Sequence, residues 1–178
     1  MNTPNTAGTT TNDTLAALSE GNTDQTRIGN KINVKSIMLR GRALIDNTAL
    51  AANTSDVLRI IVYLDRQANG ATAAVTDILA TGNWRSFNNL DNNDRFRTLC
   101  EWTCSLNVGG ATPSGGAYVF GRKTKEFFLK AKLGQDFKYK GNAGTVADLA
   151  SSNIGVLAIS AQGTVQLEYI ARLKFVDI

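Results

Sequence analysis

Strand periodicity covers most of this chain and constrains its fold more than any other feature. A spacing of two between apolar residues places them on one face of a β-strand. The run VLRIIVYL at residues 57–64 is almost continuously apolar, which is typical of a strand buried on both faces. Helical turns are favoured only at residues 15–18 and 73–79, and both are short. Strand-type runs occupy residues 32–45, 57–64, 95–106, 126–133, 135–140, 154–161 and 165–176. We therefore expect seven or eight strands and almost no helix.

A chain of 178 residues is long enough for one domain with a substantial core. Two sheets that each have one apolar face bury those faces against each other. The sequence therefore predicts an all-β fold, an antiparallel β-sandwich. Jelly-roll and immunoglobulin-like topologies share this pattern, but the long connections at residues 66–94 and 107–125 favour a single jelly roll of about eight strands.

Residues 1–26 differ from the rest of the chain in composition. They are rich in Thr and Asn and contain few large apolar side chains, so we expect a flexible N-terminal arm before a folded domain at residues 27–178. The arm holds three acidic residues and no Lys or Arg, which leaves 19 basic and 12 acidic residues in the domain, a formal charge of +7. This excess favours contact with a polyanion, although lysines that keep strand faces soluble are an equal alternative.

The residue types exclude most catalytic sites. There is no histidine, which removes the Ser-His-Asp and Cys-His arrangements, His-ligated zinc and a histidine pH switch. The glycine-rich stretch at residues 109–116 lacks the order GxxxxGK[ST], and no GxSxG is present. Asp91 and Asp94 are interpreted as hydrogen-bond anchors near a turn. We expect no enzyme, no cofactor and no metal.

Cysteine content and hydropathy argue against a disulfide-linked protein and against a membrane-spanning one. Cys100 and Cys104 would share one strand face about 13 Å apart, too far for a disulfide, so free buried thiols are expected. No apolar run approaches the roughly 20 residues that cross a bilayer, so no membrane insertion is expected.

Four blocks of sequence, in order along the chain, carry a family resemblance. They are RIGNKINVKSI at residues 27–37, RIIVYLDRQANG at 59–70, VTDIL at 75–79 and NNLDNNDRF at 88–96. Together they resemble capsid (coat) proteins of small circular single-stranded DNA viruses that encode a replication initiator, the circovirus-like and related groups. The later half of the chain is similar only in its basic strands and β-rich end.

The resemblance implies a structural capsid protein, with residues 27–178 as its jelly-roll shell domain. It implies that about sixty copies self-assemble into a small icosahedral shell around a circular single-stranded DNA genome. The protein would then lie in the virion and pass through the host nucleus during assembly. Its partners would be copies of itself, single-stranded DNA bound without sequence preference, and an unknown host receptor.

Basic residues near the start of the domain and in its middle are the candidate DNA contacts. They would bind phosphates in a manner independent of sequence and sensitive to salt. Aromatic side chains near the cations, Phe137, Tyr139 and Trp84, could stack on unpaired bases, but strand alternation favours the core for the first two. The candidate nucleic-acid-binding residues are Arg27, Lys31, Lys35, Arg40, Arg42, Arg122, Lys123 and Lys125.

The acidic arm departs from the family pattern, in which a long Arg/Lys-rich arm binds the genome. Two interpretations stay open: the basic domain alone binds the genome, or a basic segment lies outside this sequence. A non-catalytic carbohydrate- or receptor-binding β-sandwich module is the alternative function, because a fold alone does not determine function. Megadalton particles would favour the capsid, and a small oligomer would favour the binding module.

Overall fold

The computed structural model describes residues 10–45, 55–107, 112–114, 117–119 and 123–178. Two short helical segments, α1 (Val75–Ile78) and the 3-10 turn η2 (Val146–Asp148), lie in connections between strands. The strands are β1 (Thr10–Thr14), β2 (Lys31–Ile45), β3 (Ser55–Asp65), β4 (Phe96–Asn107), β5 (Thr112–Ser114), β6 (Ala117–Val119), β7 (Lys123–Lys138), β8 (Asn153–Ser160) and β9 (Val165–Asp177).

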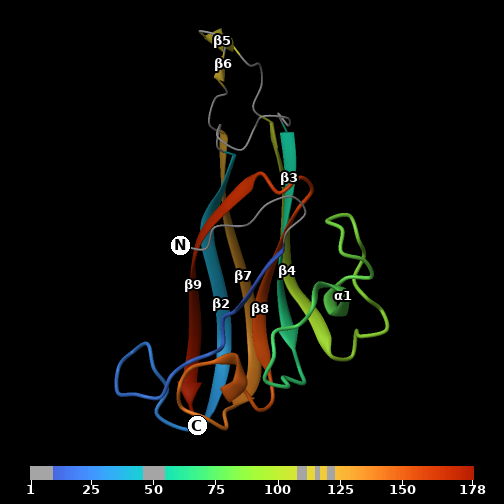
Figure 1. The fold of residues 1–178 in the computed structure, drawn as a ribbon. Coiled ribbons are helices and arrows are strands. Elements are labelled where there is room, and N and C mark those ends of the chain that lie inside the picture. The colour runs from blue at the N-terminus through green and yellow to red at the C-terminus, as the bar shows by residue number, and fades with distance from the viewer. Residues whose placement is uncertain (1–9, 46–54, 108–111, 115–116, 120–122) are drawn as a thin grey trace.

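Seven of these strands form two antiparallel sheets that pack face to face (Figure 1). One sheet has the order β1-β8-β3-β4 and the other the order β7-β2-β9. The short β5-β6 hairpin projects beyond one end of the sandwich (Figure 1). The predicted all-β jelly-roll sandwich is confirmed, with seven strands in its two sheets where about eight were expected.

Strand alternation places the main core between the sheets. The β7-β2-β9 sheet contributes side chains such as Ile32, Leu39 and Phe127, and the facing sheet contributes Ile60 and Val156. Residues 126–133 and 135–140, expected as two runs, belong largely to the single long strand β7, which passes through Gly134 opposite an irregularity in β2.

A second apolar cluster lies on the outer face of the β1-β8-β3-β4 sheet. Ile61 and Tyr63 of β3 point outward there and are fully buried beneath Leu79 and Ile78 of the segment between β3 and β4. Figure 1 shows this segment, with α1, lying against that side of the sandwich. The prediction that residues 57–64 form a strand buried on both faces is therefore confirmed.

Part of the stretch that composition marks as an arm packs against the sandwich. Strand β1 pairs with β8 at the edge of its sheet, Ala16 is fully buried, and Asn12 accepts a hydrogen bond of 2.7 Å from the Tyr63 hydroxyl. Residues 1–9 lie outside the described residues. The sequence TTNDT of β1 contains no apolar residue, so it shows no strand periodicity. Backbone pairing with β8 and a few side-chain hydrogen bonds hold it in place.

Candidate nucleic-acid interface

The outer face of the β7-β2-β9 sheet is exposed along much of its length, and its side chains lie in cross-strand rows. The register pairs Lys132 and Lys174 with Ser36, and one row further along it pairs Lys130 and Arg172 with Met38. Neighbouring strands lie about 4.8 Å apart, so the two cations of one row, with β2 between them, are about 10 Å apart at the backbone, and successive rows are about 7 Å apart. We call these two rows the cationic rows.

The four cationic side chains in these rows, Lys130, Lys132, Arg172 and Lys174, are all exposed. None of them forms an ion pair with another residue in the part of the chain that the structure describes. Like charges this close repel each other, so the site favours a polyanion that neutralises them.

Two of the predicted candidates lie on the same face, in the next two rows. Arg40 is exposed between Phe128 of β7 and Ile170 of β9. Arg42 donates a hydrogen bond of 2.6 Å to Glu168, and this bond raises the pKa of the Arg42 guanidinium. Arg40 is therefore continuous with the cationic rows, while much of the charge of Arg42 is neutralised.

At the opposite end of β2, Lys31 and Lys35 flank a carboxylate. The ammonium group of Lys31 lies 2.9 Å from Asp136, whose other oxygen accepts a hydrogen bond of 2.6 Å from Asn33. The bonds from Asn33 and Lys31 lower the pKa of Asp136, and the nearby charge of Lys35 contributes. Lys35 is exposed at the irregularity of β2 next to the row of Ser36, so it extends the cationic rows more effectively than the paired Lys31.

The remaining candidates lie elsewhere. Lys123 and Lys125 are exposed but belong to the other face of β7, because they stand opposite Ile45 and Ala43, which point into the core. Arg122 lies outside the described residues.

Arg27 has no surface to offer a phosphate in this structure, because its side chain is 0% exposed. Its guanidinium donates to the carbonyl oxygens of Leu18, at 3.2 Å, and of Gly29 and Gly141, and lies 4.2 Å from the centre of the Tyr139 ring. A buried guanidinium needs partners of this kind. Arg27 thus acts as a structural anchor for the segment that enters β2.

The aromatic residues considered for base stacking are mostly core residues. Phe137 is fully buried, and the hydroxyl of the buried Tyr139 donates to the carbonyl oxygen of Ala16 at 2.8 Å. Trp84 is half-buried against the second cluster. The aromatic residue that sequence reasoning missed is Phe128, whose side chain is 61% exposed beside Arg40.

Lys130 and Lys132 belong to a basic cluster that is visible in the sequence, at residues 122–140, but sequence reasoning did not join them with Arg172 and Lys174 into one site. The available signal was the spacing of two within each pair, which places both cations on one face of their strand. Their convergence depends on the sheet order, because β7 and β9 flank β2 only in the folded protein.

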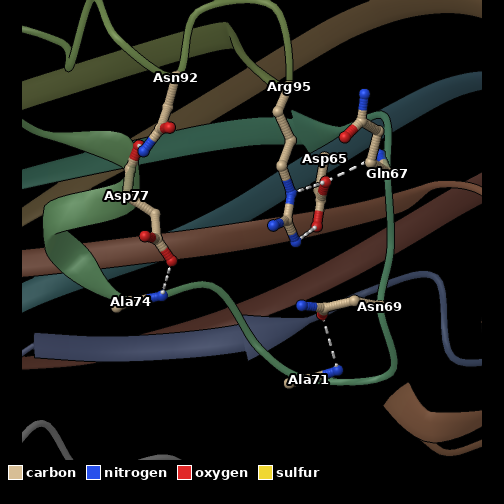
Figure 2. Close-up of polar contacts among 8 residues, drawn as sticks. All are labelled: Asp65, Gln67, Asn69, Ala71, Ala74, Asp77, Asn92 and Arg95. Atoms are coloured by element: carbon tan, nitrogen blue, oxygen red, sulfur yellow. Dashed lines mark hydrogen bonds and ion pairs between the residues drawn. The ribbon is translucent and has the colours of Figure 1, made fainter.

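Three of the four blocks that carried the family resemblance, at residues 59–70, 75–79 and 88–96, contribute residues to a loop anchor. Figure 2 shows Arg95 bonded to both oxygens of the buried Asp65, at 2.9 and 3.0 Å, and the backbone N–H of Gln67 donating to Asp65 at 2.9 Å. In the same view the Asp77 carboxylate accepts a bond of 2.8 Å from the backbone of Ala74, at the start of α1. These polar residues hold the segment between β3 and β4 on the sheet.

The two cysteines have the properties of unreactive thiols. Cys100 and Cys104 are free thiols, as predicted, and burial raises the pKa of both, to about 11 for Cys104. Among the described residues, no cluster of three His, Cys, Asp or Glu side chains could hold a metal ion. Those residues also include no helix with the length and hydropathy of a membrane span.

A family model, the satellite tobacco necrosis virus coat protein, matches residues 1–178. No curated protein matches the chain. The match overturns the resemblance to capsids of circular single-stranded DNA viruses, because this family belongs to an RNA virus. The expected DNA genome and passage through the host nucleus depended on that resemblance and lose their basis with it. Three of the four blocks behind the resemblance include residues that anchor a loop, and such residues carry no information about the genome.

A coat protein role is compatible with the observed structure, a two-sheet sandwich with a basic outer face and unreactive thiols. The role it assigns is structural and non-enzymatic, in the virion. The chain belongs to the satellite tobacco necrosis virus coat protein family.

Proposed function

We propose that copies of this chain close into a small icosahedral shell of about sixty subunits around an RNA genome, and that the cationic rows face that RNA. The family match supports a capsid role and an RNA virus. A shell needs a rigid subunit, and a jelly-roll sandwich with two apolar clusters supplies one.

The observation that carries the RNA contact is the pair of cationic rows. Four exposed cations without ion-pair partners among the described residues occupy two adjacent rows, and Arg40 and Lys35 extend them at either side. Lysine and arginine that bind phosphates displace counterions from the RNA, which makes binding sensitive to salt, and phosphates are the same at every nucleotide, which makes binding independent of sequence.

The other predicted candidates take smaller parts in this proposal. Lys31 and Arg42 are each bound to a carboxylate, so a phosphate must compete for them. Lys123 and Lys125 reach the same RNA only around the edge strand β7, because they lie on its other face.

Particle formation tests the proposal directly. The full chain is expressed and purified without added nucleic acid, then analysed by electron microscopy, sedimentation and absorbance at 260 and 280 nm. We expect closed particles in the megadalton range whose absorbance ratio reveals packaged RNA. A protein that stays monomeric in every buffer contradicts the shell, and closed but empty particles that bind no added RNA contradict the RNA contact.

A further inference from the structure

An open hollow lies on the outer face of the β7-β2-β9 sheet, next to the cationic rows. Its volume is about 680 Å³. Gly41 allows β9 to approach β2 closely beneath it, since a Cβ there would lie 2.1 Å from the carbonyl oxygen of Glu168. The lining residues are Arg40, Gly41, Arg42, Glu126, Glu168, Tyr169 and Ile170.

The character of this sheet face changes in one direction along the strands. The cationic rows come first, followed by the row in which Arg40 stands between two exposed apolar side chains, Phe128 and Ile170. Phe128 is 61% exposed and Ile170 is 79% exposed. An exposed phenylalanine beside a cation is the arrangement on which unpaired bases stack.

The next row adds hydrogen-bond acceptors. Glu126 and Glu168 stand on either side of Arg42, at the far end of the hollow from the cationic rows. Carboxylates repel phosphates, so an RNA backbone is favoured over the cationic rows and disfavoured here. Carboxylates also accept hydrogen bonds from exocyclic amino groups such as N4 of cytosine.

We propose that an unpaired RNA base enters this hollow and stacks on Phe128, which stands beside the lining residue Arg40, while the phosphates of the same strand lie on the cationic rows. The inference rests on the proposed RNA contact and adds a base site to it. The carboxylate of Glu126 accepts from the amino group of cytosine or adenine, while Glu168 stays bonded to Arg42. Uracil has no amino group, so it binds less tightly.

Phosphate contacts and base stacking can be distinguished experimentally, because they differ in how they depend on salt. Phosphate contacts determine the slope of the logarithm of the binding constant against the logarithm of the salt concentration. Stacking releases no counterions, so losing it lowers the affinity equally at every salt concentration.

The test uses fluorescence anisotropy with labelled single-stranded RNA 12-mers of only A, only C or only U. The full chain is kept unassembled, as verified by light scattering. We expect Phe128→Ala to weaken binding of the C 12-mer by about fivefold or more at all salt concentrations, with the slope unchanged. Phe128→Trp, which keeps an aromatic ring at this position, should bind the C 12-mer as tightly as the wild type does. Phe87→Ala, at an exposed phenylalanine on the other side of the sandwich, serves as the control and leaves the affinity unchanged.

Glu126→Ala, which removes the acceptor oxygens together with the charge, provides a second, independent readout. If the carboxylate only repels RNA, this change raises binding of all three 12-mers by the same factor, which overturns its role in base recognition. If it accepts from the base, the preference for C over U decreases. Wild-type affinity in Phe128→Ala overturns the base site alone, whereas a wild-type chain without salt-dependent RNA affinity overturns the proposed RNA contact itself.

Discussion

The outer faces of the two sheets differ in what covers them. The β1-β8-β3-β4 sheet presents Ile61, Tyr63 and Leu157 outward, and the chain's own segment between β3 and β4 buries them. The β7-β2-β9 sheet presents Lys132, Ser36 and their neighbours outward, and much of that face is exposed. An apolar face is unfavourable in water, and here the subunit's own segment covers it, while a basic face can stay solvated until a partner binds.

The covered face depends on a few polar anchors as well as on apolar packing. Arg95 and Asp65 join the two ends of the covering segment, and Arg59 donates to the carbonyl oxygens of Trp84 and Ser86 within it. Each anchor satisfies groups that would otherwise be buried without partners. The exposed face has ion pairs of the same chemistry, and solvent weakens them.

The largest expected effect comes from breaking the anchor of the covering segment. Arg95→Met leaves the buried carboxylate of Asp65 without its cation, and we expect a loss of about 3–5 kcal/mol in the free energy of unfolding. Urea titration measures it. The matched control is Arg42→Met, which removes an arginine–carboxylate pair on the exposed face and should change stability little. Equal losses in the two variants would contradict the contrast between the faces.

An apolar truncation should show the same contrast with a smaller effect. Leu79→Ala opens a cavity under the covering segment, where the side chain is 0% exposed, and we expect a loss of about 3 kcal/mol. Ile170→Ala removes an apolar side chain from the exposed face and should stay within about 0.5 kcal/mol of the wild type. Thermal and urea unfolding give both values. A larger loss in Ile170→Ala would mean that something within the subunit covers that face.

RNA affinity sharpens the comparison between the two faces of β7. The double variant Lys130→Gln, Lys132→Gln removes two of the proposed phosphate contacts, so the magnitude of the slope of log binding constant against log salt should decrease by about 1.4. Lys123→Gln, Lys125→Gln makes the same charge change on the other face of the same strand and should alter the slope much less. Anisotropy titrations with single-stranded RNA at several salt concentrations distinguish them. Identical slopes for the two variants would show that only net charge matters.

The smallest expected effect is a pH dependence at the turn between β8 and β9, which joins the two sheets. Burial alone would raise the pKa of Asp56, but hydrogen bonds from Ser160, Thr164 and Gln162 outweigh it and lower that pKa. A carboxylate with a lowered pKa contributes stability above its unfolded pKa of about 3.9, and this contribution is lost as the pH falls through the folded value. Urea titrations should show a steeper acid loss below about pH 4 in the wild type than in Asp56→Asn. The same acid slope in both would exclude Asp56 as the cause.

Strand alternation was sufficient to predict the sandwich and the burial of β3 on both faces, because period and composition report directly on which faces are apolar. It also favoured the core for Phe137 and Tyr139, where both lie. Strand β1 escaped detection because Thr10–Thr14 contains no apolar residue and depends on pairing with β8.

The candidate site was only partly predictable. Arg27 belonged by sequence to a basic cluster, yet its burial depends on carbonyl oxygens from Leu18 and Gly141, which only the fold brings together. The cationic rows could not be predicted without the sheet order, because nothing in the sequences of β7 and β9 shows that both strands flank β2. The kind of genome was not predictable from the loop blocks, because Asp65 and Arg95 serve the subunit's own stability.

RNA is proposed to contact the exposed face of the β7-β2-β9 sheet and not the covered face of the other sheet. Ultraviolet crosslinking of RNA within purified particles, followed by mass spectrometry of the crosslinked peptides, tests it most directly. We predict crosslinks at residues 124–132 of β7 and 168–174 of β9. Crosslinks concentrated in the segment between β3 and β4, with none on β7 or β9, would contradict it.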